Sequence, residues 1–207
     1  MDISLKGRFK DSLYTPSNEM IKDFLWQSNI IVYRSLDLVA NLLKNQPGMN
    51  GVLYLAVGEG TEEWDENPPT EQPSTRQLVK EIFRKRIDPS IAMSYSEEAK
   101  TLIINVKIDS DEAVGILREF GLFGGDATDA LNSGFLINYK IHPKIDKTAP
   151  TILKRTIYLD FGAEARPIAN AGDDQIVEYG TSFILDGSKS TPSPGRRIVK
   201  YRWLMLD

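Results

Sequence analysis

The sequence predicts an α+β body, in which an N-terminal helix packs on an antiparallel β-sheet or sandwich, followed by a smaller all-β unit. Between Ser17 and about Asn45, apolar residues recur at spacings of three and four, as on one face of a helix. Farther along, short apolar runs alternate with polar residues, which favours antiparallel strands with one wet face. Residues 162–166 have the composition of a linker, so we expect domains at residues 1–165 and 166–207.

The predicted helix has plausible ends as well as a periodicity. Ser17 and Asn18 are suitable N-caps, and residues 46–48 would end the helix because Pro lacks an amide donor and Gly tolerates positive φ. Ser28 and Asn29 are where it would divide into two shorter helices. We interpret the apolar stripe as a core-facing surface, with a helix that binds a partner as the alternative. The stripe consists of Ile21, Phe24, Leu25, Val32, Leu36, Val39 and Leu43.

The β-structure is predicted from six apolar runs. The segment between residues 62 and 73 is rich in proline and carboxylates and should be a surface loop, whereas residues 75–87 are amphipathic and fit either a helix or a strand. The six apolar runs are each bounded by turn residues, so we interpret them as strands. The predicted strands cover residues 52–57, 91–96, 102–108, 117–123, 135–142 and 152–161.

Composition limits the classes of function. With 25 basic and 29 acidic residues the net charge is −4, so nothing attracts the chain to phosphate and we expect no nucleic-acid partner. The absence of Cys excludes disulfides and thiolate chemistry. The first eight residues carry charges where a signal peptide needs apolar residues, so we expect neither Sec-type export nor membrane insertion.

No residue pattern indicates catalysis, a cofactor or a bound metal. His142 is the only histidine, and one histidine cannot build the usual zinc sites. The carboxylates between Glu59 and Glu66 lack the spacing of a calcium loop, so we interpret them as a solvated loop. Glu119 has no second carboxylate or nucleophile at a recognisable spacing for general acid catalysis. We therefore expect a protein that is not an enzyme.

Five phrases follow one another in the first part of the chain. They are residues 55–61 (LAVGEGT), 80–85 (KEIFRK), 119–123 (EFGLF), 147–148 (KT) and 157–161 (IYLDF). Their order and spacing, over residues 18–162, resemble the tail-fibre, tail-collar and baseplate-associated proteins of tailed phages and related injection machines. The sequence departs from that pattern at Glu59, where a small or polar residue is usual, and in a longer loop before Pro73. The resemblance implies structural attachment.

The phrase from Glu119 to Phe123 also has a physical interpretation. Its apolar side chains point both ways, with Phe120 and Leu122 on one face and Leu117 and Phe123 on the other, so we expect a strand buried on both sides. Gly121 would allow a neighbouring chain to approach closely. A buried Glu119 would need a partner, which Arg84 or Arg118 could supply. We take Glu119, Gly121, Leu122, Phe123 and Arg84 as structural or interface candidates.

Four further phrases follow the linker. They are residues 167–175 (PIANAGDDQ), 178–181 (EYGT), 185–190 (LDGSKS) and 198–203 (IVKYRW). They are similar to the opening half of a polycystic-kidney-disease (PKD) type domain, an Ig-like β-sandwich. Asp186 and Gly187 would close a turn, and Tyr201 and Trp203 would project into the sandwich core. The sandwich would be incomplete, so we expect either a longer natural protein or a second chain that supplies the missing strands.

Together these features predict a structural component of a phage tail or contractile injection particle. It would connect the baseplate or tail to a fibre or to an outward-projecting receptor-binding module. The expected partners are other tail, baseplate or fibre proteins, in several copies per particle, with a host-surface glycan or receptor as a further candidate. We expect assembly in the cytoplasm and a final location in the virion tail or an extracellular particle. A secreted adhesin or carbohydrate-binding accessory module is the alternative.

Overall fold

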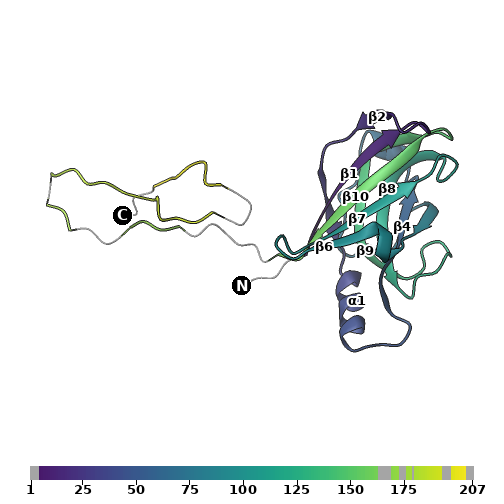
Figure 1. Cartoon of the computed structure of the whole chain (residues 1–207), viewed down its shortest axis with the longest axis horizontal. Helices are drawn as coiled ribbons and strands as arrows, with labels where there is room; N and C mark the ends of the chain where they lie inside the picture. Colours follow the sequence, from purple (N-terminus) through teal and green to yellow (C-terminus); the bar gives the residue numbers. More distant parts are fainter. Residues whose placement is uncertain (1–4, 163–168, 173–175, 179, 193–196, 204–207) are drawn as a thin grey trace. The chain divides into compact units, whose positions relative to one another are not determined.

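The computed structural model describes residues 5–162, 169–172, 176–178, 180–192 and 197–203 (Figure 1). It groups these residues into two compact units, which we describe separately. Leu5–Phe161 form one unit, which we call the body. The described residues from Gly162 onward belong to the other, which we call the second unit.

The body is built on one antiparallel sheet of ten strands. Its strand order is β5-β4-β8-β9-β3-β1-β10-β7-β6, and β2 adds to β1. Helical structure within the body is limited to α1 (Arg34–Leu43), α2 (Pro89–Ala92) and the short 3₁₀ helix η1 (Glu62–Asp65). The strands are β1 (Lys6–Tyr14), β2 (Met20–Asp23), β3 (Gln27–Ile31), β4 (Asn50–Gly58), β5 (Glu81–Arg86), β6 (Met93–Ser96), β7 (Thr101–Ile108), β8 (Gly115–Gly125), β9 (Phe135–Lys147) and β10 (Ile152–Asp160).

The predicted α+β body is therefore wrong, because the body is mostly antiparallel sheet. Of the helix predicted between Ser17 and Asn45, only α1 forms, and β2 and β3 occupy the first half. Asn18 has a positive φ of 65°, within a turn that returns the chain toward β1. The amide of Phe24 then donates to the carbonyl of Asp11 on β1. Pairing with β1, which local periodicity cannot detect, outweighs the helical spacing of the apolar residues.

The described residues after the linker contain none of the strands expected for an all-β sandwich. Residues 176–178, 182–185 and 198–203 are described, and none of them belongs to a strand. The hydroxyl of Ser190 accepts from the amide of Asn170, 20 residues earlier in the chain, and the carboxylate of Asp186 accepts from the amide of Ser188. Strands require neighbours that share their hydrogen bonds, and these segments do not pair with one another.

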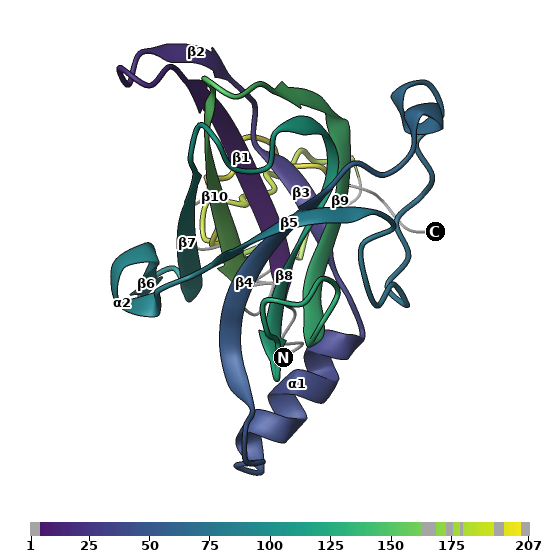
Figure 2. The same ribbon diagram turned by 90° about the vertical axis from the view of Figure 1, so that its right-hand side faces the viewer.

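The buried apolar side chains of the body form two clusters. The larger one contains Phe9 of β1, Leu55 of β4, Ile104 of β7 and Ile157 of β10, so strands far apart in the strand order face one another. Figure 2 accordingly shows β1, β10 and β7 in one layer and β4, β8 and β9 in the other. The smaller cluster lies on the opposite side of β8 and β9 and includes Phe123.

Strand β8 is buried on both faces, as predicted for residues 117–123. Phe120 and Leu122 lie in the larger cluster and Phe123 in the smaller one. Leu117 was expected to share a face with Phe123, but it packs with Phe120 and Leu122. The pairing of β8 with β9 shifts register between Leu117 and Glu119, and such an irregularity turns the side chains before it to the other face.

An ion pair lies inside the body between its first and last strands. Arg155 of β10 is fully buried and donates from Nε and Nη2 to the two carboxylate oxygens of Asp11 of β1, each over 2.7 Å. The Arg155 guanidinium also lies 3.9 Å from the centre of the Phe120 ring. This bidentate geometry offsets the cost of taking both charges out of water.

His142 of β9 lies beside this ion pair and is itself buried. Its Nδ1 is 2.9 Å from the carbonyl of Pro143, which can only accept, so Nδ1 carries the proton and Nε2 is left as an acceptor. Nη2 of Arg155 is 3.3 Å from that Nε2 and donates to it. Burial, reinforced by the positive charge of Arg155, lowers the pKa of His142 from 6.5 to about 4.

This depressed pKa predicts a loss of stability in mild acid. In the unfolded chain His142 takes up a proton near pH 6.5, whereas in the folded body it does so only near pH 4. The unfolded state therefore binds more protons in this window, and the free energy of unfolding should fall by up to about 3 kcal/mol as the pH is lowered through it.

Urea unfolding of the wild type and of His142→Gln between pH 4 and pH 7, compared at each pH, isolates this contribution, because titration of the carboxylates is common to both proteins. The stability advantage of the wild type should shrink as the pH falls. Parallel stability curves for the two proteins would contradict the assignment.

Candidate functional site

Glu119 lies at the centre of a hydrogen-bonded group that includes candidate residues. It is on β8 with 0% of its surface exposed. Its carboxylate accepts from the amides of Val79 at 3.0 Å and Lys80 at 2.7 Å, and from the hydroxyl of Tyr139 at 2.7 Å. The carboxylate thereby anchors the segment before β5 to the sheet. Burial and the negative charge of Glu119 raise the pKa of Tyr139 well above its usual range, so the phenol stays a donor.

The predicted pairing of Glu119 with Arg84 or Arg118 does not occur, because each arginine has another acid beside it. Arg84 of β5 is buried and forms two hydrogen bonds with Glu81, at 2.6 Å and 2.9 Å. It also donates to the carbonyl of Thr128 and lies 4.8 Å from the centre of the Phe123 ring. Arg84 therefore fixes the loop between β8 and β9 over the smaller apolar cluster.

Arg118 fixes the acidic loop in the same manner. Its guanidinium donates to both carboxylate oxygens of Asp65, at 2.8 Å and 3.0 Å, and Lys144 adds a third contact at 2.9 Å. These hydrogen bonds hold the pKa of Asp65 well below its usual range. The loop thus has attachment points on β8 and β9. Within the described residues, no group of three or more His, Asp or Glu is arranged to hold a metal ion.

The other candidates of the central strand serve packing. A Cβ on Gly121 would lie 2.8 Å from the carbonyl oxygen of Asn138 and 2.4 Å from a methyl carbon of Leu136, so glycine is required where β9 approaches. Leu122 and Phe123 are fully buried. Their role at an interface stays a prediction. Any partner of the folded body would contact the surface around them rather than these side chains.

Apolar side chains are exposed at two ends of the body. The first group, which we call the β2 patch, consists of Met20, Ile21, Leu25 and Trp26, and Leu25 is 86% exposed. The second, which we call the α1 stripe, consists of Leu36, Val39, Ala40 and Leu43, and Leu43 is 79% exposed. Both Figure 1 and Figure 2 place β2 and α1 at opposite ends of the body. Apolar groups gathered in this way commonly mark contact surfaces.

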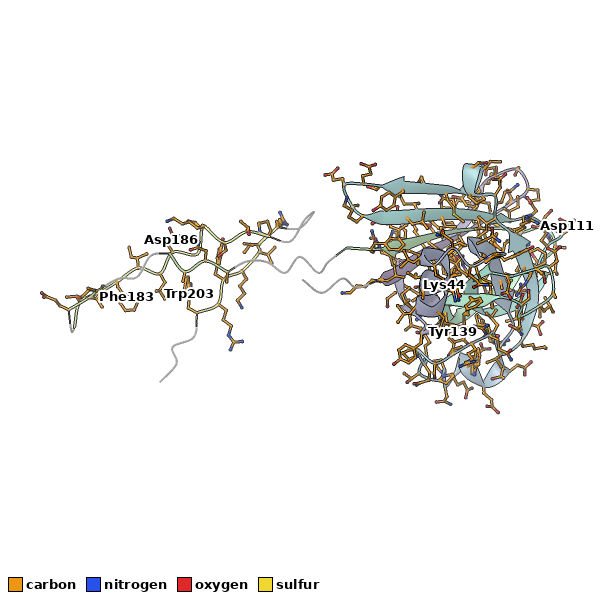
Figure 3. The ribbon with its side chains drawn as sticks, turned by 90° about the horizontal axis from the view of Figure 1, so that it is seen from below. Lys44, Asp111, Tyr139, Phe183, Asp186 and Trp203 are labelled. Carbon is orange, nitrogen blue, oxygen red and sulfur yellow. The ribbon has the colours of Figure 1, made fainter. Side chains whose placement is uncertain are left out.

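The second unit brings Tyr201 and Trp203 together. Both rings lie against Gly187, and each side chain is about half exposed. They line a cleft of about 440 Å³ together with Asn170 and Ser190. Figure 3 shows Trp203 and Asp186 in this unit. The sandwich core into which Tyr201 and Trp203 were expected to project stays a prediction.

Sequence reasoning missed Asp11, Arg155 and Tyr139. A usable signal existed for the first two, since Asp11 falls between Phe9 and Leu13 on the inward-facing positions of an alternating strand. A charged residue on the apolar face of a strand indicates a buried partner. For Tyr139 no such signal is present, because its partner lies on another strand.

No protein-family model matches this chain, and no curated protein matches it. Among the described residues, no helix is both long and apolar enough to cross a membrane. The resemblance to phage tail and baseplate proteins therefore stays a prediction that rests on the quoted phrases.

The carboxylate of Glu119 should contribute strongly to stability. Glu119→Gln replaces one of its acceptor oxygens by a donor, which faces a backbone amide that also donates. We expect a loss of about 2–3 kcal/mol in the free energy of unfolding, and about 1 kcal/mol for Tyr139→Phe, measured by urea denaturation. The exposed Glu98→Gln is the matched control and should change stability by less than about 0.5 kcal/mol. Equal effects of Glu119→Gln and Glu98→Gln would refute the anchoring role.

Proposed function

We propose that this chain is a structural component of a phage tail or contractile injection particle, in which the body connects neighbouring proteins. The observation that carries the proposal is the presence of exposed apolar groups, the β2 patch and the α1 stripe, at opposite ends of one body. A connector needs two separated contact surfaces on a stiff support. The ordered sequence phrases that resemble tail-fibre and baseplate proteins support the same assignment.

The interior of the body suits a load-bearing support. Its loops are attached to the sheet by charged side chains of low exposure: Glu119 binds the segment before β5, Arg118 the acidic loop, and Arg84 the loop after β8. Surfaces mounted on such a body keep their relative positions when a partner binds. Because a particle repeats its components, contacts that are individually weak can still produce firm attachment.

The proposal is tested by tagging the full chain in the cell that produces it and imaging what copurifies by electron microscopy. We expect a repeated assembly such as a ring or a set of spokes. Leu25→Glu should reduce incorporation by at least about tenfold, because it places a charge in the β2 patch. Ile91→Glu is the matched control, since Ile91 is 85% exposed and lies outside both apolar groups. Isolated chains without any assembly would contradict the proposal.

A carbohydrate-binding module is the second candidate, favoured by the cleft of the second unit. Aromatic rings beside polar groups are suited to stacking on and hydrogen bonding to a sugar, and here Tyr201 and Trp203 lie beside Asn170 and Ser190. Titration of the full chain with a panel of neutral oligosaccharides should then show binding that Trp203→Ala abolishes and Trp26→Ala preserves. Absence of binding to every sugar in the panel, or equal effects of the two substitutions, would remove this candidate.

A further inference from the structure

Helix α1 uses only one side to pack on the body. Ser35 and Leu38 are its buried residues, and a methyl carbon of Leu38 lies 3.1 Å from where a Cβ on Gly124 would stand. Arg34 lies over the ring of Phe135, at 4.6 Å from its centre. These contacts fix the orientation of the helix on β4, β8 and β9. The remaining apolar residues of α1 therefore point away from the core.

The exposed side of α1 has the pattern of a helix-pairing seam. Leu36, Val39, Ala40 and Leu43 follow one another at spacings of three, one and three, so they share one face. Leu36 and Leu43, at the two ends of the seam, are seven positions apart, or about 10 Å at 1.5 Å per residue. Figures 1 and 2 show α1 at one end of the body.

Two opposite charges border this seam. Asp37 and Lys44 are seven residues apart, so they lie on the same side of the helix, about 10 Å apart along its axis. Within the part of the chain that the structure describes, neither side chain forms an ion pair; Asp37 uses its backbone carbonyl to accept from Asn41. Lys44, labelled in Figure 3, directly follows the last residue of α1.

We propose that the α1 stripe binds the same stripe of a second copy of this chain, with the two helices antiparallel about a twofold axis. With the axis between Val39 and Ala40, Leu36 of one copy meets Leu43 of the other. Asp37 of each copy then lies within one helical turn of Lys44 of the other copy, which forms two attractive pairs. A parallel pair about a twofold axis would place the charges of the two copies on opposite flanks of the seam, where they form no attractive pair, so the charge pattern favours the self-complementary antiparallel pair.

The size of the seam sets the strength of this dimer. A pair of short helices buries less surface than a standard interface, so we expect a dissociation constant in the micromolar range. Such a contact is weak between free chains and becomes effective when copies are held side by side. The inference deepens the proposed function, because it names the partner of one end of the body. Its test on the purified chain is independent of any particle.

The first experiment measures the oligomeric state of the full chain by sedimentation equilibrium across the micromolar range. Leu43→Glu should weaken dimerisation by at least about a hundredfold, since the twofold axis places the substitution in the interface twice. Leu43 is 79% exposed in the folded chain, so the fold should persist, which circular dichroism checks. Ile91→Glu, at an exposed site away from the seam, should leave dimerisation unchanged.

The second experiment tests the antiparallel geometry by exchanging charges. Asp37→Lys and Lys44→Asp should each weaken the dimer by about tenfold, because each replaces two attractions by two repulsions. The double variant Asp37→Lys/Lys44→Asp restores opposite charges across the axis and should recover the wild-type dissociation constant. If the two charges affected only solubility, the double variant would not recover the wild-type dissociation constant.

Each contrary result has a distinct meaning. A chain that stays monomeric throughout the micromolar range, a dimer indifferent to Leu43→Glu, or a double variant no tighter than the single ones would overturn the antiparallel pairing. If such a monomer still entered particles through the β2 patch, the proposed function would stand without this inference. A dimer that responds as expected but never occurs in a particle would retain the inference and remove the proposed function.

Discussion

The buried ion pair between Asp11 and Arg155 holds together the two halves of the sheet. In the strand order, β1 and β10 separate the strands β5, β4, β8, β9 and β3 from the strands β7 and β6, so their pairing connects these two sets of strands. Asp11 and Arg155 are direct cross-strand partners in that pairing. A shift of one residue would turn Asp11 outward and leave the guanidinium unpaired, which costs about 3–5 kcal/mol for a buried charge. The ion pair therefore specifies the register.

Buried charged side chains also fix the loops at the periphery of the body. Besides the buried ion pair, two other buried charged side chains form hydrogen bonds with backbone groups of loops. Glu119 binds two amides of the segment that precedes β5, and Arg84 binds a carbonyl in the loop after β8. Removing such a charge would take away the hydrogen-bond partner of these partly buried backbone groups. Loop positions are thus tied to the sheet by these hydrogen bonds as well as by buried apolar side chains such as Leu78.

Sequence patterns predicted individual strands better than they predicted the architecture. The runs 102–108, 117–123 and 152–161 correspond closely to β7, β8 and β10, because their alternation or continuous apolar character reflects local geometry. The predicted helix failed over β2 and β3, where pairing with β1 decides the conformation. Phe123 and Leu122 could be predicted as buried from their strand alone. The partners of Glu119 could not, since backbone amides carry no sequence signal.

The distribution of polarity in the body gives the attachment hypothesis its physical basis. The interior contains charged residues such as Arg155 and Glu119, each of which forms specific hydrogen bonds, while large apolar residues such as Leu25 and Leu43 lie at the surface. Buried charge pairs favour one register or fold over others and seldom add much stability. Exposed leucines contribute little to the stability of the body, and the free energy of burying them is still available to a partner. A body of this kind is fixed internally by polar contacts and has apolar surface available at its two ends for other chains. Because a repeated assembly can cover both ends of every copy, it is the setting in which these exposed leucines would be buried.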